Sequence, residues 1–424
     1  MSIHSEIDFL EKVLVHRPGI EHKFVLPSQT NEILVVNDIM KKNPDFILFD
    51  DIIDHQKIGK EHDDLSNILN TWTDGNCFYL IDLLLELFTN NSARLEVFNN
   101  CLELEKKLLK STNISNTNFI KNLSTIEFVN MLISGRNGET KVFNYSLPNF
   151  MFTRDIGVVL GNSILISNAH FPVRKRENII SKYLIENHQL FKRYKKINFK
   201  DISNGLSIEG GDVMVFNDKI VIIGISQRTP LKSVEILSSH IFNEGFDFVI
   251  GVELPKKREV MHLDTVLTRA SDNECIIYPP LFNKKNNYDK DLNIYLFKSD
   301  EKNKITRPFD ETLLDLLAKL DIDVVPINCG GEKEINQKRE QWTEGANCFA
   351  LAPGKIIGYK RNYETINELI KRGYKQISVD LFLNNSDHWI STDEKFIIVI
   401  DGSELVRGRG GMRCLTMPIK RRNG

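Results

Sequence analysis

A single cysteine stands at the end of a loop rich in glycine and arginine, close to the end of the chain. The loop reads Ser403-Glu-Leu-Val-Arg-Gly-Arg-Gly-Gly-Met-Arg-Cys414. Cationic neighbours favour the thiolate over the thiol and can lower a cysteine pKa from about 8.5 towards roughly 3.5–7.5. We therefore expect Arg407, Arg409 and Arg413 to activate Cys414 as a nucleophile.

The glycines of this loop, Gly408, Gly410 and Gly411, have no Cβ atom. We expect them to take positive φ angles and to let the backbone approach a ligand closely. The alternative is a C-terminal strand in which Cys414 is a small, buried and inert side chain, as free cysteines commonly are. Other polar residues must decide between these two interpretations.

Three further short stretches place polar side chains at the boundaries of expected strands or turns. Asp155 ends one stretch, Glu209 precedes two glycines in the second, and His262 and Asp264 lie in the third. In a strand, residues two apart project to the same face, so His262 and Asp264 would point together. Each stretch also has a structural alternative. Asp155 would pair with Arg154 or cap a turn, Glu209 would lie on a solvated strand end, and the third stretch would hold a buried pair between strands.

The combination of these residue types predicts nucleophilic catalysis. A Cys–His pair with nearby carboxylates uses the thiol as nucleophile and the imidazole as proton shuttle. Two or three carboxylates in one pocket imply a cationic substrate. The same histidine and carboxylates suit a divalent metal, but this alternative leaves the thiol loop unexplained and ranks lower. The loop is not a dinucleotide-binding motif, because Arg413 occupies the last position of the glycine pattern.

The composition is typical of a globular protein with nearly balanced charge. The 424 residues include 55 basic and 57 acidic side chains, a net charge of −2. The lack of a basic excess argues against a nucleic-acid-binding protein, and the most apolar run, 78–88, is too short to span a membrane. The first twenty residues contain no secretory apolar segment, and no two cysteines have CxxC spacing. We therefore expect reduced thiols in a cytoplasmic protein.

A repeated order of elements must position these residues. Residues 213–254 predict a strand, a turn, a second strand, a helix that begins at Thr229-Pro230, and a third strand. Residues 348–381 repeat this order, and a weaker copy begins at Gly157 with a hairpin turn at Gly161-Asn162. Such repetition predicts units that pack around a common centre. Its irregular period does not give their number.

Residues 64–137 differ from the repeats. Apolar residues recur at helical spacing between Leu95 and Leu109. Ser124 and Glu127 have capping-box spacing before a helix that Gly135 can end. We expect a helical insertion over 64–137 in a catalytic domain made of residues 1–63 and 138–424.

A series of motifs runs in a fixed order along nearly the whole chain. They are Val13-Leu-Val-His-Arg-Pro18, Asn149…Phe-Thr-Arg-Asp155, Glu209-Gly-Gly-Asp212, Gly224-Ile-Ser-Gln-Arg-Thr229, Met261-His-Leu-Asp-Thr265, Arg339-Glu-Gln-Trp342, Glu404-Leu-Val-Arg-Gly-Arg-Gly-Gly…Cys414 and Met417-Pro418. Together these motifs resemble the arginine deiminase family. The resemblance implies a guanidino-modifying, pentein-type α/β-propeller of five ββαβ-like units around a pseudo-fivefold axis, with a helical insertion. It also implies hydrolysis of L-arginine to L-citrulline and ammonia without metal or organic cofactor.

The resemblance also implies roles for the reactive residues. Cys414 matches the nucleophile that attacks the guanidinium carbon, which leaves a covalent S-alkylthiouronium intermediate. His262 matches the general acid and base. Asp155 and Asp264 match carboxylates that hold the guanidinium nitrogens through charge-assisted bonds, and Glu209 matches the third acidic residue.

The remaining matches concern the rest of the substrate. Arg174 and Arg228 match arginines that bind the α-carboxylate, Asn149 matches a substrate contact, and Arg409 matches a loop residue that gates the thiol. Because agmatine lacks a carboxylate, Arg174 and Arg228 favour free arginine as the substrate. A homo-oligomer, dimer or tetramer, is compatible with the sequence.

Two features depart from the family pattern. Residues 381–396 read as an insertion before the last strand of that region, and Met412 replaces a residue that is often proline or glycine. Neither is a matched catalytic position. Three alternatives stay open: a deiminase of another guanidino compound such as agmatine, a catalytically silent protein that binds arginine, and a metal-dependent hydrolase.

Overall fold

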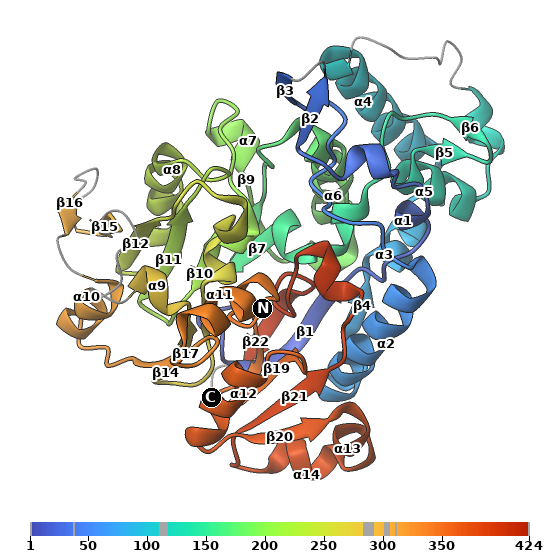
Figure 1. The fold of residues 1–424 in the computed structure, drawn as a ribbon. Helices are drawn as coiled ribbons and strands as arrows, with labels where there is room; N and C mark the ends of the chain where they lie inside the picture. The colour runs from blue at the N-terminus through green and yellow to red at the C-terminus, as the bar shows by residue number, and fades with distance from the viewer. Residues whose placement is uncertain are drawn as a thin grey trace.

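The chain folds into an α/β structure of several small sheets with helices beside them (Figure 1). The computed structural model describes residues 2–36, 39–109, 118–282, 292–300, 306–309 and 312–422. Figure 1 also shows that helices α3 (Leu80–Leu87), α4 (Asn91–Leu109) and α5 (Thr125–Ser134) gather at one side of the molecule.

Five sheets of the described chain have three or more strands. They are β22 (Met417–Arg422), β1 (Phe9–Val15) and β4 (Cys77–Tyr79); β7 (Gly157–Leu160), β8 (Ser163–Ile166) and β9 (Lys195–Asn198); β10 (Val213–Val215), β11 (Ile220–Ile225), β12 (Phe248–Glu253), β15 (Ile294–Lys298) and β16 (Thr306–Phe309); β13 (Leu267–Arg269), β14 (Glu274–Ile277) and β17 (Val325–Asn328); and β18 (Phe349–Ala352), β19 (Lys355–Tyr359), β21 (Phe396–Ile400) and β20 (Lys375–Ser378). Two further strand pairs join β2 (Ile33–Val36) to β3 (Ile39–Lys42) and β5 (Arg136–Asn137) to β6 (Thr140–Lys141).

The predicted repeat is confirmed in two of its copies. In each, an antiparallel hairpin is followed by a helix and by a strand parallel to the second strand of the hairpin. The helices are α6 (Lys175–Asn187) and α8 (Leu231–Phe242). A helix is the usual connection here because parallel neighbours need a crossover. The predicted hairpin turn at Gly161 is also present, with φ at +55°.

The third predicted copy differs from the expectation at its end. Hairpin β18–β19 and helix α12 (Tyr363–Lys371) are present, but β20 ends at Ser378 and pairs with β21, which lies between β19 and β20. The Ser378 side chain accepts a hydrogen bond from the Leu381 amide and so begins α13 (Val379–Asn384). The expected long loop over 381–396 therefore contains helix, continued by α14 (Ser386–Ser391).

The sequence did not predict the unit of β13, β14 and β17. Between β14 and its parallel partner β17 lie the short helices α9 (Pro279–Phe282) and α10 (Leu313–Lys319). Two strands of a neighbouring sheet, β15 and β16, also fall in this interval. The strand pairing of this unit is the same as in the two confirmed copies. Its last strand, β17, begins far along the chain from the hairpin β13–β14, so the repeat is not apparent in the sequence.

The helical part follows its local sequence signals. Ser124 and Glu127 form the predicted capping box of α5, and Gly135 ends that helix with φ at +75°. Helix α2 (His55–Trp72) crosses the expected boundary at residue 64 and contacts β1, β4 and β21. Among the described residues, no helix combines the length and the apolar character needed to cross a membrane.

Two buried histidines make the fold sensitive to acid. His22, in α1 (Ile20–Lys23), and His62, in α2, have ring nitrogens without hydrogen-bond partners among the described residues. Burial lowers the pKa of His22 to about 4 and that of His62 to about 3. Because both imidazoles take up protons more readily in the unfolded chain, their destabilising effect is absent above about pH 6.5 and grows as the pH falls towards these values.

We expect the free energy of unfolding to fall by on the order of 2 kcal/mol for each of these histidines between pH 7 and pH 5. Urea unfolding at several pH values measures this loss. A His62→Leu variant removes one of the two titrating groups, so its stability should depend less on pH than that of the native chain. Equal pH dependence in both proteins would contradict the assignment of the acid sensitivity to His62.

Candidate active site

A small cavity brings together side chains that are far apart in the sequence. The predicted residues that line it are Asn149, Asp155, Arg174, Arg228, His262, Arg409 and Cys414. Glu209 and Asp264 are fully buried beside it. Its volume, about 20 Å³, is close to the space of one water molecule. A substrate the size of arginine must therefore displace side chains when it binds.

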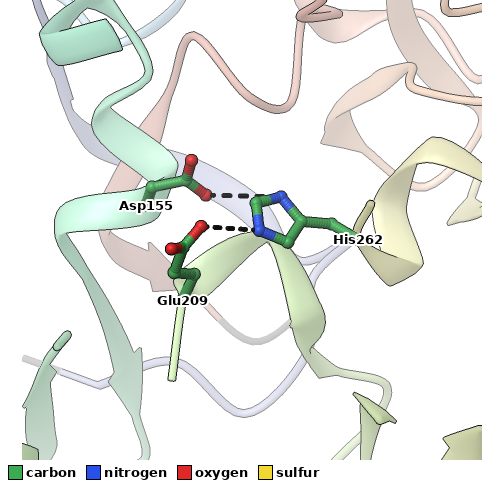
Figure 2. A group of neighbouring side chains, drawn as sticks. All are labelled: Asp155, Glu209 and His262. Carbon is green, nitrogen blue, oxygen red and sulfur yellow. Dashed lines mark hydrogen bonds and ion pairs between the residues drawn. The ribbon is translucent and has the colours of Figure 1, made fainter. Parts of the chain in front are cut away.

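His262 is held between two carboxylates, as Figure 2 shows. Its Nε2 atom lies 2.9 Å from Oε2 of Glu209, and its Nδ1 atom lies 3.7 Å from Oδ1 of Asp155. Burial alone would lower the pKa of His262, but Asp155, Asp212 and the hydrogen bond with Glu209 raise it to about 9. At neutral pH the imidazole is therefore protonated and can donate a proton.

The segment around His262 is not the predicted strand. His262 precedes the 3₁₀ turn Leu263–Thr265, so the expectation that His262 and Asp264 project from one strand face is wrong. The Leu263 amide donates to Oδ1 of Asp212, which fixes the turn. A Cβ atom on Gly211 would lie 2.5 Å from Nδ1 of His262, so this close packing requires glycine.

The Cys414 thiol lies among acidic groups. Its Sγ atom is 3.6 Å from Oδ2 of Asp264 and 3.1 Å from Nδ2 of Asn347. Burial raises the pKa of the Cys414 thiol well above its ordinary value, and the nearby carboxylates of Asp264, Glu344 and Asp155 raise it further. The prediction of a thiolate activated by arginines is therefore wrong for the free protein.

Two of the three arginines of the loop are paired with acidic side chains. Arg407 pairs with Asp51 and Glu404, near the surface. Arg413 is buried between Glu6 and Asp264. Because acidic partners balance their charges, these two arginines do not give the net positive field that the sequence suggested.

Arg409 lies against an aromatic ring. Its guanidinium carbon is 3.5 Å from the centroid of the Trp342 ring, and its Nε atom is 3.9 Å from Oε1 of Glu344. None of its three nitrogens has a hydrogen-bond partner among the described residues. The expectation of positive φ angles at Gly408, Gly410 and Gly411 is wrong: within this loop the residue with a positive φ angle is Arg409, at +64°. The unsatisfied guanidinium on the cavity wall is free to form new polar contacts with a ligand.

Contacts from two other elements hold the loop in place. Glu61 of α2 accepts hydrogen bonds from the Ser403 hydroxyl and from the Glu404 and Leu405 amides. The Tyr359 hydroxyl donates to the carbonyl oxygen of Gly410. The loop that presents Cys414 is thus fixed by the helix α2 and by the strand β19.

Arg174 and Arg228 contact carboxylates inside the site. Nη1 of Arg174 donates to Oδ2 of Asp155 at 2.7 Å, and Nη1 of Arg228 donates to Oε2 of Glu209 at 2.9 Å. Burial would raise the pKa of Glu209, but Arg228, His262 and Arg174 hold it well below its usual range. Asn149 donates from Nδ2 to the Ile47 carbonyl. The expected role of both arginines at a substrate carboxylate remains a prediction.

Two residues of the site were missed in the sequence. Asn347 contacts Sγ of Cys414 directly. Glu344 is 1% exposed, has φ at +63°, and has no hydrogen-bond partner for its carboxylate within the described residues. Burial raises its pKa to about 8, although Arg409 opposes this effect. The motif Arg339–Trp342, which lies a few residues before both, was the available signal.

The ligand atoms of Asp155, Glu209 and His262 lie within 4.8 Å of one another, a spacing that a metal ion could use. Arg174, however, lies 2.7 Å from Asp155 and 3.5 Å from Glu209, and Arg228 lies 2.9 Å from Glu209. These guanidinium groups already balance the carboxylates, and they would repel a divalent cation. The site therefore fits a metal poorly.

Comparisons with known proteins agree over most of the chain. Residues 45–421 match the family model described as arginine deiminase. Arginine deiminase of Listeria monocytogenes is 32% identical, and the match covers 100% of this chain and 98% of that protein. Arginine deiminase 1 of Staphylococcus epidermidis is 30% identical, and the match covers 99% of this chain and 98% of that protein. The solved structure of SxtG, an amidinotransferase from Microseira wollei, shares the fold with a TM-score of 0.51 and 13% identity, and the match covers 100% of this chain and 98% of that one. The match to the family model and the similarity to these relatives over the full length show that the chain belongs to the arginine deiminase family.

Proposed function

We propose that this protein hydrolyses L-arginine to L-citrulline and ammonia, with Cys414 as nucleophile and His262 as general acid and base. The observation that carries the assignment is that Cys414 and a protonated His262 line one cavity together with the carboxylate of Asp155. No cofactor is needed for this reaction, because every group it requires is a side chain or a water molecule.

The cavity suits a planar cation. Oδ1 of Asp264 is buried without a hydrogen-bond partner among the described residues, so it offers an unused acceptor on a carboxylate whose other oxygen, Oδ2, lies 3.6 Å from Sγ of Cys414. Asp155 provides a second carboxylate on the cavity wall. A guanidinium group presents several N–H donors in one plane, which match carboxylate oxygens in pairs. Its charge also offsets the acidic field that raises the pKa of Cys414, so the substrate itself favours the thiolate.

The first half of the reaction forms a carbon–sulfur bond. When the guanidinium binds, Cys414 releases its thiol proton to solvent, and the thiolate adds to the guanidinium carbon and gives a neutral tetrahedral adduct. The His262 imidazolium then protonates one amino nitrogen, the carbon–nitrogen bond breaks, and ammonia leaves. A cationic S-alkylthiouronium remains on Cys414.

The second half breaks the carbon–sulfur bond. The neutral His262 imidazole takes a proton from water while the oxygen adds to the same carbon. The adduct then collapses: the thiolate of Cys414 leaves, and the proton of the added hydroxyl passes through solvent to the released ammonia, which gives citrulline and ammonium. The sum is one arginine cation and one water converted to citrulline and ammonium, with His262 protonated again.

A citrulline assay tests this function. Purified protein with arginine should release citrulline and ammonium in equal amounts, and prior removal of metals with EDTA should leave the rate unchanged. Loss of activity on metal removal, restored by a divalent ion, would support the metal-dependent alternative. Tight arginine binding without citrulline would support a silent binding protein.

Deimination of agmatine is a second candidate, because Arg174 and Arg228 contact internal carboxylates rather than an open position for a substrate carboxylate. We favour arginine and expect Arg228→Ala to lower kcat/KM for arginine about 10- to 100-fold more than for agmatine, since agmatine has no carboxylate to lose a contact. Steady-state kinetics with both substrates measure this ratio. Equal losses for the two substrates would show that Arg228 acts only through Glu209.

We also propose that the fold is a five-unit α/β-propeller. In this proposal each of the five larger sheets is one unit, and the helical insertion lies within residues 64–137 of a catalytic domain made of residues 1–63 and 138–424. Strand β4 falls in the inserted range but pairs with β1, so it belongs to the sheet and not to the insertion. Support comes from the topology that the sheets of β7–β9 and β10–β12 share. A cytoplasmic location and a homo-oligomeric state remain predictions. The six cysteines are free thiols, as a reducing compartment would require.

A further inference from the structure

One buried carboxamide contacts the reacting sulfur and three backbone groups around it. Nδ2 of Asn347 lies 3.1 Å from Sγ of Cys414 and 3.0 Å from the carbonyl oxygen of Asp264. Oδ1 of Asn347 accepts from the amides of Arg413 and Cys414 at 3.0 and 3.2 Å. The side chain is 1% exposed, so water does not replace these contacts.

The surrounding groups fix which end of this amide faces the sulfur. Two backbone N–H donors meet one end, so that end must be the oxygen. A carbonyl oxygen lies at the other end and accepts only from the nitrogen. The amide therefore presents an N–H group to Sγ of Cys414.

The backbone holds this amide against the loop. The Met412 amide donates to the Asn347 carbonyl at 3.1 Å. A Cβ atom on Gly411 would lie 2.5 Å from Cβ of Asn347, so the loop can approach Asn347 this closely only because residue 411 is glycine. The donor is thus positioned before a substrate binds, which is the condition for an effective electrostatic contribution to catalysis.

The charges around the sulfur show why a donor matters. Asp264, Glu344 and Asp155 all disfavour a negative sulfur, and Arg413 is paired with Glu6 and Asp264. Among the described residues, two groups donate a hydrogen bond to Sγ of Cys414: the backbone amide of Gly411 and the side chain of Asn347. Hydrogen bonds to a charged group are roughly twice as strong as those between neutral groups.

We propose that Asn347 is a catalytic residue: its carboxamide N–H donates to Sγ of Cys414 and stabilises the thiolate that attacks the substrate. This inference rests on the proposed function and adds a residue to it. The alternative is a purely structural amide that holds the loop through Oδ1 and the backbone.

The substitution Asn347→Asp separates the two roles. An aspartate has the same shape and keeps an oxygen for the Arg413 and Cys414 amides. It replaces the nitrogen that donates to Sγ of Cys414 and to the Asp264 carbonyl by a negatively charged acceptor. We expect the rate of Cys414 alkylation by iodoacetamide at pH 8, followed on the Cys414 peptide by mass spectrometry, to fall about 10- to 100-fold. We expect kcat for arginine to fall by at least as much.

Asn362→Asp is the matched control. Asn362 is also a buried amide, 3% exposed, but its carboxamide bonds to the side chain and the carbonyl of Thr343. The same substitution there should leave the alkylation rate of Cys414 within about twofold of the native rate, whatever its effect on thermal stability. Unchanged alkylation in a folded Asn347→Asp variant would overturn the catalytic role and leave the structural one.

A measurement on the native protein covers the case in which Asn347→Asp does not fold. With ¹⁵N-asparagine labelling, one side-chain amide proton should shift with the same midpoint as Cys414 alkylation, and Cys414→Ala should abolish that titration. Amide resonances that do not respond to the state of Cys414 would refute the hydrogen bond. Both tests read the thiol directly, so they stay valid if the native protein makes no citrulline, an outcome that would refute the proposed function instead.

Discussion

Replacing Cys414 by alanine should abolish citrulline formation, with a loss in kcat of about 10⁴-fold or more. The variant has no atom that can form the carbon–sulfur bond, and the remaining groups can only bind the substrate and polarise it. Citrulline release over hours, compared with the native protein, measures the residual rate. The same samples analysed by mass spectrometry should show an arginine-derived adduct on the native protein and none on Cys414→Ala.

Two controls define what that loss means. Cys77→Ala changes a cysteine in β4, outside the cavity, and should keep full turnover. Arginine should still bind Cys414→Ala, because Asp155 and Asp264 remain in place. Binding can even be tighter than in the native protein, since a nearby thiol no longer takes up space in a cavity of about 20 Å³. Retained citrulline formation in Cys414→Ala would reject the nucleophile assignment.

The parts of the fold that the sequence predicts are those with local causes. The capping box at Ser124 and Glu127 needs only four consecutive residues, and the hairpin turn at Gly161 needs one glycine with positive φ. The end of the third repeat could not be read this way. The position of β20 beside β21 depends on hydrogen bonds between strands, which the local sequence does not encode. Ser378 begins helix α13, but a serine at that place in the sequence is equally typical of a loop.

The charge state of the Cys414 thiol also could not be predicted from local sequence. Along the sequence Arg413 is the nearest cation to Cys414, but the fold supplies Glu6 and Asp264 to pair with it. Glu6 lies 407 residues and Asp264 149 residues from Arg413 in the sequence. The sequence neighbours of Cys414 therefore predicted the wrong direction for the shift of its pKa. Motif resemblance does better here, because it names residues that meet in space.

The second large effect is expected from His262→Asn, which should lower kcat about 10²- to 10⁴-fold. Asparagine can keep a hydrogen bond to Glu209 or Asp155 but cannot exchange a proton near neutral pH. Both halves of the proposed reaction use this group, first to protonate the leaving nitrogen and then to deprotonate water. Since Cys414 is intact, the variant differs from Cys414→Ala in one respect: any adduct that forms should persist on the protein.

The matched control is His240→Asn on α8, a histidine that does not line the cavity and whose loss should leave turnover unchanged. Rapid quenching and mass spectrometry then distinguish the steps. Accumulated adduct in His262→Asn would mean that water activation limits the variant, and slow ammonia release without adduct would mean that protonation of the leaving nitrogen does. Native turnover in His262→Asn would remove the imidazole from the mechanism. In that case the raised pKa of His262 would reflect only its position between Asp155, Asp212 and Glu209. Glu344, whose own pKa is about 8, would then be the candidate for proton transfer near Cys414.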